Sequence, residues 1–116
     1  MPLTIDKVKD IHHYGGTILG SSRGGFDGEK IINSLLEKGI NQLFIIGGDG
    51  THKGIMALYK IIKERNLKIS IVGLPKTIDN DIPIIDKSFG FETAVAEAVK
   101  AIKSAYVESH SAEYGV

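Results

Sequence analysis

The sequence contains no cysteine, and this absence excludes disulfide bonds and thiolate metal sites. The formal net charge at pH 7 is zero, so the chain offers no electrostatic attraction for nucleic acid or an anionic membrane. No apolar run approaches the ~18 residues that a membrane span requires. Residues 1–7 carry neither the apolar segment of a signal peptide nor an Arg- and Ser-rich transit pattern. We therefore expect a cytoplasmic protein with no nucleic-acid or membrane partner.

The length and apolar content are those of a small globular unit. The chain of 116 residues is long enough for one domain at most, and 42% of its side chains are apolar. Its 14 glycines fall mostly within three short segments, residues 15–20, 24–28 and 47–50. Clustered glycine indicates special backbone geometry at a few points and argues against a low-complexity chain.

Apolar periodicity alternates between short strands and helices along the chain. We expect strands at 17–19, 42–46 and 68–72. Helices are expected from Thr4, from an Asp27 cap to a left-handed Gly39, after Thr51, and from about Phe89 through Ala105. This alternation predicts an α/β fold: a parallel sheet with flanking helices that cross over between strands. We interpret every apolar helix stripe as core.

Two polar turns directly follow apolar runs that we expect to be buried strands. Residues 47–51 (GGDGT) follow one run, and residues 75–81 (PKTIDND) follow the next. Parallel strands end on the same edge of a sheet, so both turns should line one crevice. The crevice would hold glycine backbone, carboxylates, a lysine and a hydroxyl. This set of groups favours phosphoryl transfer from a metal-bound phosphate.

The first turn has the context of a phosphate loop, because its glycines follow a strand and precede a helix. It is neither the G-x-G-x-x-G fingerprint nor a Walker A loop. A bare carboxylate at Asp49 would repel a phosphate by ~4 kcal/mol at about 4 Å and an effective dielectric of ~20. A Mg²⁺ ion held by Asp49 removes this conflict. The alternative is an ordinary tight turn in which Asp49 caps the next helix.

The second turn supplies the groups that phosphoryl transfer needs at the acceptor. Asp79 or Asp81 could accept the proton of a hydroxyl, and Lys76 could stabilise charge on the migrating group. Thr77 has the same parity as both aspartates, so an extended segment would aim all three to one side. The alternative is an Asx-turn in which residues 79–81 bond their own backbone.

Arg23 lies among glycines and could contact a phosphate or a base, although a lone loop arginine is also common on surfaces. Histidines 12, 13 and 110 are isolated from other metal-type residues, and we interpret them as solvated.

Four segments carry a resemblance to a known family, in the family's order: 15–21 (GGTILGS), 47–51 (GGDGT), 75–81 (PKTIDND) and 89–94 (FGFETA). Together they resemble 6-phosphofructokinases, in particular the plant, trypanosomatid and spirochaete branch. The glycine motif alone is also similar to NAD kinases and diacylglycerol kinases, whereas the TIDND segment makes the phosphofructokinase resemblance specific. The resemblance implies a Rossmann-type three-layer domain that phosphorylates fructose 6-phosphate in glycolysis.

The resemblance also assigns roles to residues. Asp79 would accept the proton of the sugar's 1-hydroxyl, with Thr77 and Ile78 also contacting fructose 6-phosphate. Asp81 would support the site and Asp49 would bind Mg²⁺. ATP would be held by Arg23, Gly24, Gly48, Asp49, Gly50 and Thr51.

Two positions bear on the phosphoryl donor. In the family, pyrophosphate users tend to carry Asp where this chain has Gly50, and Lys where it has Lys76. Gly50 leaves room for a nucleotide's α-phosphate, and the plant and trypanosomatid ATP enzymes resemble this chain in combining it with lysine. We therefore favour ATP; the alternatives are pyrophosphate as donor, a NAD or lipid kinase, and a non-catalytic nucleotide-binding module.

The resemblance also implies that parts of the enzyme lie outside this sequence. The family's first strand and its phosphate loop would precede residue 1, and the Met-Gly-Arg segment and second domain would follow residue 116. We therefore expect residues 1–116 to be a partial nucleotide- and sugar-phosphate-binding domain. The isolated chain should be inactive, and the full-length protein should form a dimer or tetramer.

Overall fold

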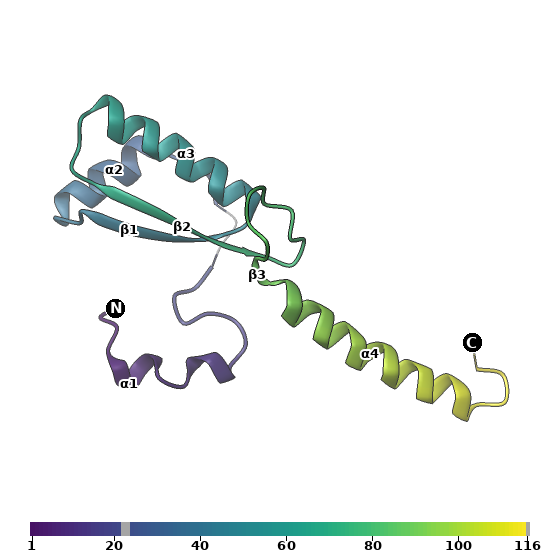
Figure 1. The fold of residues 1–116 in the computed structure, drawn as a ribbon. Coiled ribbons are helices and arrows are strands. Elements are labelled where there is room, and N and C mark those ends of the chain that lie inside the picture. The colour runs from purple at the N-terminus through teal and green to yellow at the C-terminus, as the bar shows by residue number, and fades with distance from the viewer. Residues whose placement is uncertain (22–23, 116) are drawn as a thin grey trace.

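The fold was analysed in a computed structural model, which describes residues 1–21 and 24–115. The helices are α1 (Ile5–Val8), the short 3₁₀ helix η1 (Ile11–His13), α2 (Gly28–Glu37), α3 (Asp49–Glu64) and α4 (Phe91–Ser111). The strands are β1 (Gln42–Gly47), β2 (Ser70–Thr77) and β3 (Phe89–Gly90). Helices flank a parallel sheet, so the predicted α/β class is confirmed (Figure 1).

The sheet has three strands in the order β1-β2-β3, and both pairs are parallel. Helix α3 connects β1 to β2, as predicted, whereas the loop 78–88 connects β2 to β3 without a helix. Strand β2 also runs further than expected, through the start of the predicted turn at 75–81. The reason is tertiary: Lys76 and Thr77 pair with Phe89 and Gly90 of β3, which the sequence did not predict.

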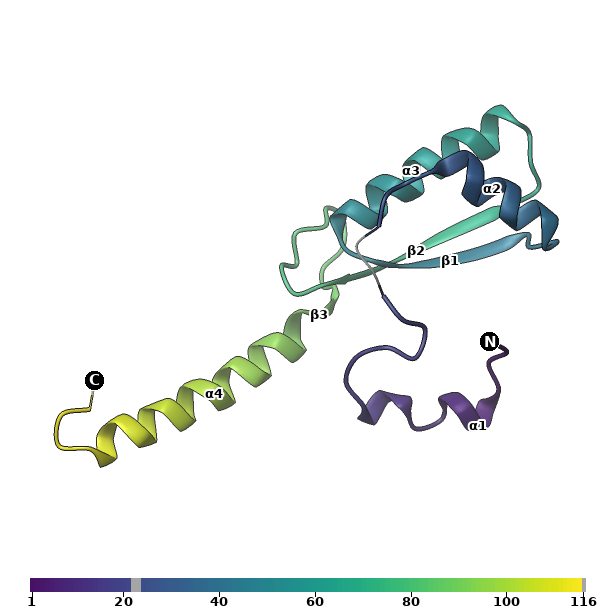
Figure 2. The same ribbon diagram turned by 180° about the vertical axis from the view of Figure 1, so that it is seen from behind.

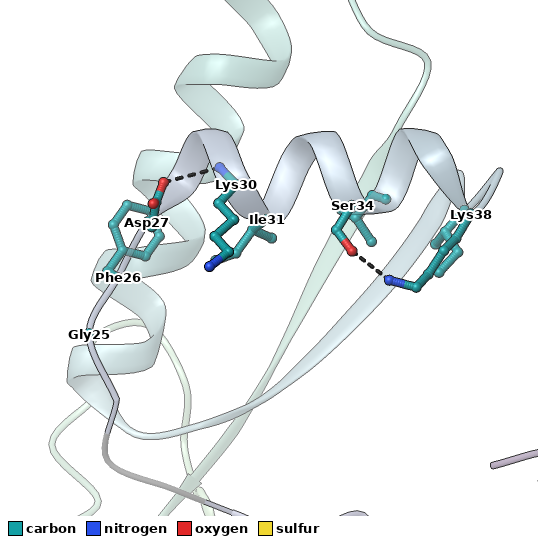
Figure 3. A pocket seen from close by; sticks show the side chains of 9 residues that line it. Gly25, Phe26, Asp27, Lys30, Ile31, Ser34 and Lys38 are labelled. Carbon is teal, nitrogen blue, oxygen red and sulfur yellow. Dashed lines mark hydrogen bonds between the residues drawn. The ribbon is translucent and has the colours of Figure 1, made fainter.

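Both ends of α2 are as the sequence predicts. Oδ1 of Asp27 accepts a hydrogen bond from the backbone N–H of Lys30 at 3.0 Å (Figure 3), which satisfies one of the unpaired amides of the first turn. Gly39 has φ +64°, and the amide of Ile40 donates to the carbonyl of Leu35. This is the left-handed helix end that glycine favours.

The core lies between the sheet and helices α2 and α3, which cover the same face of β1 and β2 (Figure 1). Its buried members are Ile32 and Leu35 of α2 and Leu58 and Ile62 of α3. Around them pack partly buried side chains from both layers: Ile31, Leu43, Ile45, Ile61, Leu67, Ile69 and Ile71.

The other face of the sheet is open within the described residues. Side chains alternate between the two faces of a strand, so Phe44, Ile46 and Val72 point away from the core and are exposed. The expectation that these strands are fully buried is therefore correct for one face only.

Two further expectations are wrong. Helices α1 and α4 have no buried residue, so their apolar stripes are not core in this structure; α4 extends away from the sheet (Figures 1 and 2). Residues 17–19 form a turn, in which the Thr17 hydroxyl accepts from the amide of Leu19 at 3.1 Å, and not a strand. In both cases the described residues provide no neighbouring element against which the segment can pack or pair.

Among the described residues, none of the helices combines the length and apolar character needed to span a bilayer.

Candidate functional site

The carboxyl ends of β1 and β2 border one cleft. Gly47 is the register partner of Pro75, so the chain leaves both strands at the same edge of the sheet. A cleft of about 570 Å³ lies there, and residues from both predicted turns line it: Ser21, Ile46, Gly47, Gly48, Gly50, Thr51, Lys76, Thr77 and Ile78. The prediction that the two turns share a crevice is confirmed.

Close packing explains one glycine of the first turn, Gly47, and does not exclude a side chain at Gly48. A Cβ atom at Gly47 would lie 2.2 Å from Oγ1 and 2.6 Å from Cβ of Thr51, closer than real atoms approach. A Cβ at Gly48 would be 3.6 Å from the carbonyl oxygen of Lys76, which is ordinary contact. Glycine at 47 therefore lets α3 begin directly above the end of β1, and the first turn then lies against the end of β2.

Asp49 is the first residue of α3, and Gly48 occupies the capping position. The alternative that Asp49 caps the helix is therefore wrong. Its carboxylate Oδ2 lies 2.7 Å from Nζ of Lys53, one turn further along α3. The hydrogen bond and charge of Asp49 raise the pKa of Lys53 above its ordinary value, and the charge of Asp81 adds to this effect.

The chemistry of Asp49 fits a magnesium ion that is shared with a ligand. No group of three or more His, Cys, Asp or Glu side chains among the described residues could enclose a metal by itself. Mg²⁺, however, usually binds one or two carboxylates and takes its other ligands from water and substrate phosphates. The Asp49 carboxylate is about half exposed, at a helix N-terminus beside the cleft.

The second turn begins with a bonded pair of polar side chains. The Thr77 hydroxyl accepts from the backbone N–H of Asp79 at 3.1 Å and lies 3.2 Å from Oδ2 of Asp79, to which it donates. Asp79 itself is exposed. Lys76 and Ile78 are exposed as well, and both line the cleft. The chain bends after Thr77, so residues 77–81 are not the extended segment that would aim alternate side chains to one side.

The Asn80 side chain bonds to the far end of the loop that follows this turn. The sequence did not predict this role of Asn80. Its side-chain Nδ2 donates to the carbonyl of Asp86 at 3.3 Å, and its Oδ1 accepts from the amide of Ser88 at 2.8 Å. The predicted alternative, an Asx-turn within 79–81, is therefore wrong for Asn80, whose bonds cross the loop. The only signal in the sequence was the residue type, because asparagine tolerates left-handed turns.

A second hollow of about 740 Å³ adjoins the cleft and shares Gly50 and Thr51 with it. Gly24, Phe26 and Lys53 are also among its lining residues. Phe26 was not predicted as a site residue. Its ring also borders a groove along α2, beside Asp27 and Lys30 (Figure 3).

The predicted site residues fall into three groups. The cleft contains Gly48, Gly50, Thr51, Lys76, Thr77 and Ile78, and Gly24 lies in the adjoining hollow. Asp49, Asp79 and Asp81 lie on the segments that border the cleft but do not line it. Arg23 lies outside the described residues.

The chain is similar in sequence to several known proteins. The chain is 57% identical over 116 residues to ATP-dependent 6-phosphofructokinase 7 of Arabidopsis thaliana, covering all of this chain and 24% of that protein. It is 53% identical to the ATP-dependent 6-phosphofructokinase of Borreliella burgdorferi, over 98% of this chain and 26% of that protein. For the Trypanosoma brucei brucei enzyme of the same name, the identity is 52%, over 95% of this chain and 23% of that protein.

The chain thus spans about a quarter of the length of these curated relatives. A family model described as "Phosphofructokinase" matches residues 1–115. The resemblance in the four sequence segments is confirmed by a match across nearly the whole chain. The chain belongs to the phosphofructokinase family.

Proposed function

We propose that the complete protein containing these residues transfers the γ-phosphoryl group of ATP to the 1-hydroxyl of fructose 6-phosphate. The observation that carries this proposal is the single cleft that both turns line, the first through its three glycines and Thr51 and the second through residues 76–78. One side of the cleft offers glycine backbone beside a metal-type carboxylate, and the other offers Lys76 and the Thr77–Asp79 pair. The curated relatives reported above are ATP-dependent 6-phosphofructokinases by name.

The two adjoining hollows suit a nucleotide donor better than pyrophosphate. The second hollow has an aromatic ring at Phe26 and the small residues Gly24 and Gly54, so it has room for an adenosine group. Gly50 and Thr51 line both hollows, and there the phosphates would pass from one into the other. Pyrophosphate would leave the second hollow empty. Arg23, beside Gly24 in the sequence, is proposed to contact ATP too.

Each site residue has a separate role in the proposed phosphoryl transfer. Asp79 accepts the proton of the 1-hydroxyl while the new oxygen–phosphorus bond forms and the bond to ADP breaks. Thr77 orients Asp79 through their hydrogen bond, Lys76 neutralises charge on the migrating group, and Asp81 supports the site. Mg²⁺, when bound at Asp49, supplies further charge neutralisation on the donor phosphates. Residues 1–116 would be part of a nucleotide- and sugar-phosphate-binding domain.

Assays of the complete protein with each donor and acceptor test this proposal. We expect fructose 1,6-bisphosphate from ATP and fructose 6-phosphate. Product with pyrophosphate alone would support the pyrophosphate enzyme, and phosphorylation of NAD or a lipid without fructose 6-phosphate would support the other kinases. Binding of Mg·ATP without any turnover would support a non-catalytic module. We further propose a cytoplasmic homo-oligomer, although two of the Arabidopsis relatives are named chloroplastic.

Replacing Gly50 tests the choice of donor. In the complete protein, Gly50→Asp should raise the ATP KM about tenfold or more, because a carboxylate near the α-phosphate repels it and fills space. Gly50→Ala is the matched control for size. A Cβ there meets no protein atom within 4 Å, so Gly50→Ala should raise the ATP KM less than Gly50→Asp does. An ATP KM for Gly50→Asp equal to that of Gly50→Ala would contradict the proposal of ATP as donor.

The isolated 116-residue chain should show no measurable phosphorylation of fructose 6-phosphate. Its cleft is open, one sheet face is exposed and α4 has no buried residue within the described part of the chain, so this chain alone does not hold two substrates in line. A coupled assay of fructose 1,6-bisphosphate formation measures this. Turnover by the purified chain would refute the expectation.

A further inference from the structure

The loop 78–88 is an unusual connection, because it joins two neighbouring parallel strands, β2 and β3, without a helix. It leaves β2 after Thr77 and returns to pair Gly90 of β3 with that same residue. A loop of this kind has no ladder of hydrogen bonds of its own. Two side chains, Asn80 and Ser88, supply the bonds that cross it.

Ser88 is the one buried polar side chain among the described residues, with 6% of its surface exposed. Its hydroxyl donates to the carbonyl oxygen of Thr77 at 2.7 Å. Its backbone amide donates to Oδ1 of Asn80 at 2.8 Å. Ser88 therefore ties the far end of the loop both to the end of β2 and to the residue after Asp79.

Asn80 has φ +52°, a left-handed conformation that costs non-glycine residues about 1–2 kcal/mol. Asparagine is among the residues that adopt it most readily. In this conformation its side chain bonds both Ser88 and the carbonyl of Asp86. The backbone strain is thus compensated by two hydrogen bonds across the loop, on the residue directly after Asp79.

Hydrogen bonds also connect Ser88, through Thr77, to Asp79, the proposed proton acceptor. Ser88 holds the Thr77 carbonyl, and the Thr77 hydroxyl bonds both the amide and the carboxylate of Asp79. The Asp79 side chain is exposed, and the hydrogen bonds with Thr77 hold it. Its position therefore depends on Thr77 and on Asn80, the two residues that Ser88 bonds. A displacement of about 1 Å at a reacting group can reduce a rate ~10²-fold.

We infer that Asn80 and Ser88 are positioning residues, which act through Thr77 to hold Asp79 at the angle required to accept the substrate's proton. This inference rests on the proposed function. The inference adds two positioning residues to that function. Asn80 and Ser88 form an asparagine–serine clamp across the loop 78–88 and lie outside the residues that contact substrate.

Ser88→Ala tests the clamp in the complete protein by removing the hydroxyl that donates to the Thr77 carbonyl. Because the Ser88 bond to the Thr77 carbonyl is lost, we expect kcat to fall about 10–100-fold, while the ATP KM changes less than about twofold. Neither Ser88 nor Asn80 lines the hollow assigned to the nucleotide. Ser104→Ala is the matched control, because Ser104 also donates to a backbone carbonyl but lies exposed on α4, so it should leave both constants unchanged.

Two Asn80 variants separate positioning from folding. Asn80→Gly adopts positive φ without strain and loses both side-chain bonds, so its kcat should fall as for Ser88→Ala. Asn80→Asp keeps an oxygen acceptor for the Ser88 amide and should recover part of that loss. Thermal unfolding of each variant identifies those that stay folded at the assay temperature. Folded Asn80→Gly and Ser88→Ala proteins with unchanged kcat would overturn the inference.

A double mutant shows whether the clamp acts through Asp79. If it does, Ser88→Ala should have little further effect on kcat in an Asp79→Asn protein, because the group being positioned is gone. If the fold reduction in kcat of the double mutant equals the product of the two single reductions, Ser88 affects the site independently of Asp79. That result would overturn the inference.

An activity assay of the unchanged complete protein distinguishes a failure of the clamp inference from a failure of the proposed function. Absence of fructose 6-phosphate phosphorylation there would refute the proposed function and, with it, the role inferred for the clamp.

Discussion

Asp79→Asn in the complete protein should reduce kcat by about 10²–10⁴-fold, which is the usual effect of removing a positioned general base. The amide cannot accept the proton of the 1-hydroxyl. Its oxygen can still accept the hydrogen bond from the Thr77 hydroxyl, so the turn should keep its geometry. The ATP KM should change little, because Asp79 does not line the hollow assigned to the nucleotide. Steady-state kinetics with both substrates varied provides the measurement.

Asp86→Asn is the matched control for this result. Asp86 lies in the same loop and is also exposed, and its carbonyl accepts the hydrogen bond from Asn80, which the substitution does not remove. Its kcat should stay close to that of the unchanged protein. A kcat for Asp79→Asn that is as high as that of the control would exclude Asp79 as the base, and Asp81 would then be the next residue to replace.

Gly47→Ala should destabilise the protein by about 1–3 kcal/mol, the usual cost of overpacking a tightly packed site. The new Cβ would lie 2.6 Å from Cβ of Thr51, and neither atom moves when a side chain changes rotamer. The first turn of α3 must therefore shift away from the end of β1. Since this turn lines the cleft, affinity for Mg·ATP should fall as well. Denaturant unfolding and nucleotide titration measure the two effects.

Gly50→Ala provides the comparison, because it makes the same chemical change three residues along the chain. A Cβ at Gly50 meets open space, and alanine suits a helix better than glycine, so a gain of about 0.4–1 kcal/mol is expected. Equal stabilities for the two variants would show that contact with Thr51 does not explain the glycine at position 47.

Local patterns were sufficient to predict several elements of this fold. The apolar stripe and the polar residue before it marked α2 and its Asp27 cap, and Gly39 marked its end. These features depend on neighbours within one or two helical turns, so the sequence carries them directly. The two turns were also found, because each combines glycine or proline with polar residues after an apolar run.

Non-local pairing accounts for the expectations that were wrong. Strand β2 continues to Thr77 because β3 pairs with its last two residues, and nothing in the sequence near Pro75 indicates this. The apolar stripes at 17–19 and on α4 have the right local pattern for core. Whether they are buried depends on which elements lie beside them, and the described residues place none there.

By itself, the sequence determined the α/β class, the family resemblance and the residue types of a phosphoryl-transfer site. These depend on the order and periodicity of residues along the chain. Only the tertiary structure showed which residues of the two turns line their shared cleft, and that Phe26 lies in the hollow beside it. Only the structure, likewise, revealed that Asn80 and Ser88 clamp the loop carrying Asp79. The reason is that strand pairing and hydrogen bonds across loops join residues far apart in the sequence.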